Sequence, residues 1–193
     1  LPITLDKGGK FHIAGQGKIV EWVLVVRRFD QSKLLDRMAE DGRLPLTAMP
    51  RLARVIADFH RNADRFLGAE ESVSALLAVI EDNAAVLAAE EASFPAGEAA
   101  TVDHASREML AALAPLLKAR AQAGYVRHCH GDLHLGNIVE IEGAPVLFDA
   151  IEFDDAIATI DVLYDLAFLL MDLGARRLPA HANAALNAYL EAC

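Results

Sequence analysis

The first 29 residues alternate in the way that predicts β-strands. Residues that would share one face of a strand between positions 20 and 26 are apolar, and β-branched side chains dominate this stretch. The segments DKGGK and AGQGK supply glycine turns on its N-terminal side. We therefore expect a strand-rich start over residues 1–29, with Trp22 as a core residue of its strand.

From Asp30 onward, apolar positions recur with the period of amphipathic helices. The segment DQSKLLDRMAEDG predicts a short helix that Asp30 caps and Gly42 ends. A second helix is expected within TAMPRLARVIADFHRNADRFL, where Thr47 is available as a cap. Two longer helices are predicted over about Ser72–Glu91 and about residues 102–123.

Short strands return after Gly124. NIVEI and PVLFD are apolar runs separated by EGA, which predicts a β-hairpin. Residues 157–173 are apolar nearly all round, which predicts one buried helix. The expected fold class is α+β: a strand-rich part over residues 1–29, and a helical part over residues 30–193 that carries the hairpin region 126–155.

Composition narrows the class of protein. The 193 residues are 54% hydrophobic and 24% charged, which is typical of a globular protein with a real core. A net charge of -10 disfavours nucleic acid and anionic membranes as partners. Cys129 and Cys193 form neither a disulfide framework nor a zinc-ribbon pattern, so a reducing, cytoplasmic location is expected. The chain begins at Leu1 rather than methionine, which suggests a piece of a longer protein.

The segment HCHGDLHLGNIVEIEGAPVLFDAIEFDD, residues 128–155, concentrates the chemistry-bearing side chains. Asp132 lies in the loop that enters the hairpin, Asn137 begins its first strand and Asp149 ends its second. Because a hairpin brings these strand ends together, Asn137 and Asp149 can share a cation. One carboxylate and one amide oxygen suit Mg²⁺ better than zinc. Asp132 would stand beside them, able to orient a substrate hydroxyl and receive its proton.

Two other interpretations compete with a magnesium site. The hairpin could be only an acidic surface with capping side chains. A zinc hydrolase is a remote alternative, because the loop resembles the metal box of metallo-β-lactamase-like hydrolases, although Leu133 interrupts that box. The zinc ligands would then come from His128, His130, Asp132 and His134.

HGDLHLGN, followed by VLFDAIEFDD and DVLYDLAFLL, resembles the aminoglycoside phosphotransferase and small-molecule kinase branch of the protein-kinase-like fold. The resemblance runs from about Glu21 to the C-terminal helices. It is strongest to the kinase-like half of bacterial proteins that also carry a P-loop ATPase domain, so a fused or associated domain of that kind is an expected partner.

The resemblance implies an ATP-dependent phosphotransferase that moves the γ-phosphate to a hydroxyl of a small molecule. Asp132 would be the catalytic base, and His130 would brace its loop. Asn137 and Asp149 would hold the Mg²⁺ of the nucleotide. Asp165, on the predicted buried helix, would hold the backbone of the catalytic loop.

The resemblance also assigns the N-terminal segment. Residues 1–29 would be a remnant of the strand-rich N-lobe with the hinge, and backbone groups near Arg27 and Phe29 would contact adenine. Protein kinases carry an arginine where Gly131 stands, and the segment after Asp149 is too short for a phosphorylated activation loop. A small-molecule acceptor is therefore expected, and the acidic balance would suit a cationic one.

The clamp that holds ATP phosphates in this family has no clear counterpart. Lys7, Lys10 and Lys18 lie among turn glycines, and no helix with a glutamate separates them from the hinge. We therefore expect an N-terminally truncated chain that is inactive alone, with a dimer covering the truncated face. The alternative is a non-catalytic, kinase-like binding or regulatory module.

Overall fold

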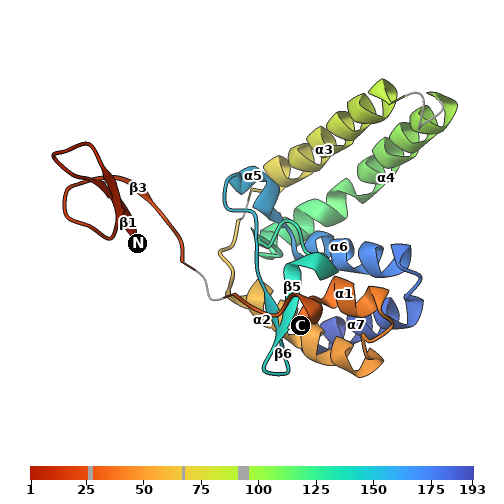
Figure 1. The fold of residues 1–193 in the computed structure, drawn as a ribbon. Helices are drawn as coiled ribbons and strands as arrows, with labels where there is room; N and C mark the ends of the chain where they lie inside the picture. The colour runs from red at the N-terminus through yellow and green to blue at the C-terminus, as the bar shows by residue number, and fades with distance from the viewer. Residues whose placement is uncertain (26–27, 67, 91–95) are drawn as a thin grey trace. The chain divides into compact units, whose positions relative to one another are not determined.

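The computed structural model describes residues 1–25, 28–66, 68–90 and 96–193 (Figure 1). The chain divides into two compact units, Leu1–Asp30 and Gln31–Cys193. The first unit is a three-stranded antiparallel sheet in the order β2-β1-β3. Its strands are β1 (Pro2–Leu5), β2 (Phe11–Ile13) and β3 (Lys18–Trp22).

This unit corrects three expectations. Lys18 is the first residue of β3 and pairs with Leu5, so it lies in a strand rather than among turn residues. The strand ends at Trp22, and the described residues after it, 23–25, are not in a strand. The Trp22 side chain is 65% exposed and is not a core residue. Three strands of three to five residues do not enclose a core, so alternating apolar residues predicted the strands but not their burial.

The second unit is largely helical. Its helices are α1 (Leu35–Glu40), α2 (Met49–Asn62), α3 (Ala69–Ala89), α4 (Ala96–Gln122), α5 (Asp155–Ala158), α6 (Val162–Ala175) and α7 (Pro179–Ala192). Its strands are β4 (Val126–His128), β5 (Ile138–Ile141), β6 (Ala144–Leu147) and β7 (Thr159–Asp161). Three 3-10 turns complete it: η1 (Gln31–Lys33), η2 (Leu46–Ala48) and η3 (Leu135–Asn137).

The core lies among α1, α2, α6 and α7, and the β5–β6 hairpin lies against it (Figure 1). Leu52 and Ile56 of α2 are fully buried with Leu169 and Leu173 of α6, and Tyr189 joins them from α7. These positions recur at helical spacing, as the sequence predicts. The α2 helix follows η2 directly and has no side-chain cap, so Thr47 does not act as its N-cap. Similarly, α1 begins at Leu35, after η1, rather than at Asp30.

The α3 and α4 helices form a long antiparallel hairpin that extends from the rest of the unit (Figure 1). Ion pairs join the two helices, Arg107 with Glu81 and Lys118 with Glu70. By length and composition, α3 could also cross a membrane, with a mean hydropathy of 1.5. In the structure it packs along α4 instead.

The residues just before α3 and those just after α4 lie next to each other. The backbone N–H of Phe66 donates to the carbonyl of Val126, and that of His128 donates to the carbonyl of Asp64, each at 2.9 Å. Arg65 and Arg127 form the bridge between these bonds. The two ends of the excursion are thus held side by side.

The predicted single helix over residues 157–173 is wrong in its first part. The chain forms the short α5, then β7, and only then α6. β7 pairs antiparallel with β4, from Val126 opposite Asp161 to His128 opposite Thr159. Asp161 caps α6 through its carboxylate, which accepts from the backbone N–H of Leu163 at 2.8 Å.

Candidate active site

The β5–β6 hairpin has the predicted place and geometry. Ile138 pairs with Leu147, and the turn residues Glu142 and Gly143 both have positive φ, as a two-residue type I′ turn requires. At the open end, the N–H of Phe148 donates to the carbonyl of Asn137 at 3.1 Å. Asn137, just before β5, and Asp149, just after β6, therefore lie at the same end of the hairpin.

Asn137 is buried, and its orientation is set by Asp132. Its Nδ2 donates to the Asp132 backbone carbonyl at 2.9 Å and to Asp132 Oδ2 at 3.0 Å. Both partners can only accept, so the amide nitrogen must occupy this side. The amide oxygen is consequently directed away from Asp132 and is available to a cation.

Asp132 is held through one of its two carboxylate oxygens. Oδ2 also lies 3.4 Å from His134 Nε2, while His134 Nδ1 accepts from the backbone N–H of Gly136 at 3.0 Å. The ring proton of a neutral His134 is therefore on Nε2, facing the carboxylate. Oδ1 has no hydrogen-bond partner in the described part of the chain, and the Asp132 side chain is 44% exposed. Asp132 is thus fixed in place yet accessible.

His130 is buried and engages both of its ring nitrogens. Nε2 lies 2.9 Å from the carbonyl oxygen of Phe148, and Nδ1 accepts from the N–H of Asp132 at 3.3 Å. A neutral ring with its proton on Nε2 satisfies both bonds. The His130 carbonyl also accepts from the N–H of Ile151 at 2.9 Å. His130 therefore ties the loop before Asp132 to the residues on both sides of Asp149.

Asp165 on α6 holds the backbone of the same loop, as the sequence analysis expected. Its Oδ1 accepts from the N–H of Gly131 at 2.9 Å, and its Oδ2 accepts from the N–H of His130 at 3.3 Å. The fully buried carboxylate also receives His60 Nε2 at 2.9 Å, and His60 Nδ1 lies 2.8 Å from the hydroxyl of Tyr189. Burial raises the pKa of Tyr189, so this hydroxyl stays protonated.

A second aspartate of α6 holds the other end of the loop. Asp172 Oδ2 accepts from the N–H of Leu135 at 3.0 Å, and its Oδ1 accepts from Arg176 Nε at 2.7 Å. Asp165 and Asp172 are about two helical turns apart and face the same side. Sequence reasoning missed both Asp172 and His60. The available signals were two aspartates at this spacing on an apolar helix, and a histidine on the apolar face of α2.

Gly131 stands where a side chain does not fit. Its φ is +80°, and a Cβ at this position would lie 2.9 Å from Cγ1 of Ile151. The left-handed backbone and this close approach both favour glycine. The arginine of protein kinases is thus excluded here by the packing of the segment after Asp149.

The donor set at the hairpin end fits Mg²⁺. Asp149 has φ +60°, is exposed, and its carboxylate has no hydrogen bond or ion pair among the described residues. One free carboxylate and one oriented amide oxygen, open to water and phosphate, match the preference of Mg²⁺ for oxygen ligands. Asn137 and Asp149 therefore stay the predicted ligands of the ion, and Asp132 Oδ1 is a further open oxygen in the same loop.

The histidines of the loop do not converge as zinc ligands would. His128 lies 3.3 Å from Asp155, His134 faces Asp132, and His130 bonds the backbone. Within the described ranges, the ligand atoms that cluster most closely belong to His60, Cys129 and Asp165. Both His60 nitrogens and both Asp165 oxygens already have partners. Burial raises the pKa of the Cys129 thiol, which donates to the carbonyl of Ile160 at 3.5 Å, so this cluster is a hydrogen-bonded core.

The other predicted residues remain untested by this geometry. Arg27 lies outside the described residues, and Phe29 belongs to the first unit. Their contact with adenine stays a prediction. Two acidic residues after Asp149 have structural places: Asp154 caps α5 by accepting from the N–H of Ala156 at 2.9 Å, and Asp155 is exposed.

Comparison with known proteins places this chain in a family. Uncharacterized proteins of Mycobacterium tuberculosis (Rv2004c) and Mycobacterium bovis (Mb2027c) are each 29% identical to the chain over 160 residues. The match covers 81% of this chain but 32% of theirs, so the chain spans about a third of the length of these relatives. No solved structure matches. The model of the Phosphotransferase enzyme family (APH) matches residues 13–192, and its kinase-like fold agrees with the α+β structure described above. The chain therefore belongs to the Phosphotransferase enzyme family.

Proposed function

We propose that this chain provides the catalytic loop and metal site of an ATP-dependent phosphotransferase, which moves the γ-phosphate to a hydroxyl of a small molecule. The observation that carries the proposal is the shared orientation of Asp132 and Asn137. One carboxylate oxygen of Asp132 is fixed by Asn137 Nδ2 at 3.0 Å, while Oδ1 is open and the Asn137 amide oxygen is directed away.

Each residue then has one role. Asn137 and Asp149 would hold Mg²⁺, which neutralises charge on the phosphate oxygens. Asp132 Oδ1 would orient the acceptor hydroxyl and receive its proton as the new phosphate ester forms. His130 and Asp165 do not touch the reacting groups. They are positioning residues that fix the backbone on which Asp132 lies.

Charge near the loop supports a cationic acceptor. A pocket of about 680 Å³ lies between the end of α2, the start of the catalytic loop and the segment after Asp149. Asp64 and Glu152 line it, and their carboxylates have no ion pair in the described part of the chain. An amine or ammonium group on the acceptor would satisfy them, whereas an anionic acceptor would be repelled.

The test is a calorimetric titration with ATP in the presence and absence of Mg²⁺. We expect magnesium-dependent binding that weakens at least tenfold in Asp149→Asn. Asp82→Asn, which makes the same charge change at an exposed position on α3, should bind like the parent chain. Magnesium-dependent binding that survives in Asp149→Asn would contradict the assigned metal site.

Binding and transfer need separate measurements. The first unit has no helix among its described residues that could present a glutamate to Lys18, so we expect little phosphoryl transfer by this chain alone. Appreciable ATP turnover by the chain alone would contradict that expectation. If the chain binds no nucleotide, the titration is repeated with any upstream segment of the natural protein present. Continued absence of binding would overturn the proposed function.

A further inference from the structure

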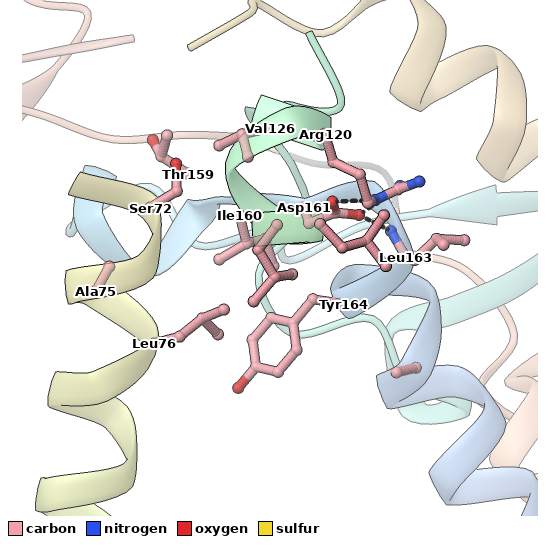
Figure 2. A pocket seen from close by; sticks show the side chains of 13 residues that line it. Ser72, Ala75, Leu76, Arg120, Val126, Thr159, Ile160, Asp161, Leu163 and Tyr164 are labelled. Carbon is pink, nitrogen blue, oxygen red and sulfur yellow. Dashed lines mark hydrogen bonds and ion pairs between the residues drawn. The ribbon is translucent and has the colours of Figure 1, made fainter. Parts of the chain in front are cut away.

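A second cavity lies at the base of the α3–α4 hairpin, away from the residues of the metal site. It has a volume of about 360 Å³ and is walled by α3, the end of α4, β7 and the start of α6 (Figure 2). Ala75 and Leu76 contribute from α3, Leu116 and Leu117 from α4, and Ala167 from α6. These walls are almost entirely apolar.

Among the described residues that line the cavity, Arg120 and Asp161 are charged, and they neutralise each other. Arg120 donates from Nε to Asp161 Oδ2 at 2.6 Å and from Nη2 to Oδ1 at 2.8 Å. This bidentate bond raises the pKa of Arg120, and its guanidinium also lies 4.4 Å from the centre of the Tyr125 ring. A charged ligand would have to break this pairing or enter an apolar site without a counterion. The cavity therefore offers no unpaired counter-charge to an ion of either sign.

Two hydroxyl groups in the wall can take part in new hydrogen bonds. The Tyr164 ring extends from α6 toward α3, and Thr159 lies on β7 (Figure 2). Neither hydroxyl has a hydrogen-bond partner among the residues that the structure describes. The third hydroxyl, that of Ser72, already donates to the carbonyl of Gly68 at 2.6 Å. A ligand with a hydroxyl or carbonyl group could satisfy Tyr164 or Thr159.

We propose that this cavity binds a neutral, largely apolar small molecule with one or two hydrogen-bonding groups. Its volume falls in the range of small-molecule sites. When an apolar ligand replaces water against these apolar walls, the free energy of binding becomes more favourable. Because Arg120 and Asp161 neutralise each other, the ligand should be neutral. The hydroxyl groups of Tyr164 and Thr159 would orient it.

The cavity is built on the same elements that position the catalytic loop. β7 pairs with β4, which leads directly to His130, and Tyr164 precedes Asp165 on α6. A ligand here would rest against the support of that loop. The binding proposal nevertheless does not depend on the proposed phosphotransferase activity.

The test uses a neutral fluorescent probe, 2-naphthol, and its anionic counterpart, 2-naphthalenesulfonate, which has the same rings. We expect saturable binding of 2-naphthol to the full chain, at least tenfold tighter than that of the sulfonate. Tyr164→Phe removes one hydroxyl and should weaken binding by about fivefold, the equivalent of one neutral hydrogen bond.

Filling the cavity supplies the decisive comparison. Ala167→Phe and Ala75→Leu add side-chain volume from opposite walls, and each should weaken 2-naphthol binding at least tenfold. Ala175→Phe makes the same substitution as Ala167→Phe, but at an exposed position of α6 outside the cavity. This control variant should bind 2-naphthol like the parent chain. Circular dichroism checks the fold, and if Ala167→Phe does not fold, Ala75→Leu decides. The proposal is overturned by absence of 2-naphthol binding, by equal binding of the sulfonate, or by cavity-filling variants that bind normally.

Discussion

Single residues in the loop around Asp132 are held by neighbours that are distant in sequence. Asp132, Asn137 and Asp149 could be proposed as site residues from sequence, because their types and spacing suit the chemistry. His60 could not be assigned, because its partner Asp165 is 105 residues away and nothing in α2 alone distinguishes it from an ordinary core histidine. The same holds for Asp172, because its partner in the loop is the backbone N–H of Leu135, 37 residues away.

Gly131 gives a prediction at this scale. Gly131→Ala should lower the free energy of unfolding by about 2 kcal/mol, because its φ is +80° and the new Cβ would meet Ile151 at 2.9 Å. Gly174→Ala is the matched control: this α6 glycine has nothing within 4 Å of the added Cβ. It should stabilise the protein by about 0.5 kcal/mol. Urea denaturation measures both, and a Gly131→Ala variant as stable as the parent would contradict the backbone assignment.

Elements were predicted well where local signals suffice. The β5–β6 hairpin follows from two apolar runs around Glu142 and Gly143, and the long helices follow from their periodicity. The boundary between β7 and α6 could not be predicted, because residues 157–173 are apolar nearly all round. What breaks the helix there is Asp161, which caps α6 and pairs with Arg120, 41 residues away.

This double role of Asp161 is testable. Asp161→Ala removes both the cap and the largely buried partner of Arg120, so we expect a loss of about 3 kcal/mol in the free energy of unfolding. Asp154→Ala removes a similar cap from the short, exposed α5 and should cost no more than about 1 kcal/mol. Equal losses in the two variants, measured by urea unfolding, would show that the Arg120 pair contributes nothing.

At the scale of the whole molecule, the sequence predicted an α+β, kinase-like chain, and the family match confirms it. The exposure of Trp22 was not predictable, because the same apolar alternation describes a strand in a large sheet and one in a small, uncovered sheet.

In the second unit, two weak acids are buried in neutral form. Burial raises the pKa of Cys129 above its ordinary 9.0 and that of Tyr189 above its ordinary 10.0.

These two groups predict a loss of stability in alkali. Above pH 9.0 the unfolded chain releases protons that the folded chain retains, so the stabilisation is complete below this pH and declines as pH rises. Each group contributes a slope of up to about 1.4 kcal/mol per pH unit. Urea unfolding between pH 8 and about pH 11 should show this decline. A Cys129→Ala, Tyr189→Phe double variant should flatten this decline, because neither replacement side chain can release a proton. An unchanged slope in the double variant would contradict the prediction.

The α3–α4 hairpin departs and returns through the hydrogen bonds between Asp64–Phe66 and Val126–His128. Because these hydrogen bonds close the base of the hairpin, an insertion or deletion farther along α3 and α4 leaves the catalytic loop and the core helices in register, as long as Arg120 still pairs with Asp161. The hairpin can therefore change in evolution independently of the catalytic loop. Related proteins can acquire new ligand preferences at its base while that loop stays the same.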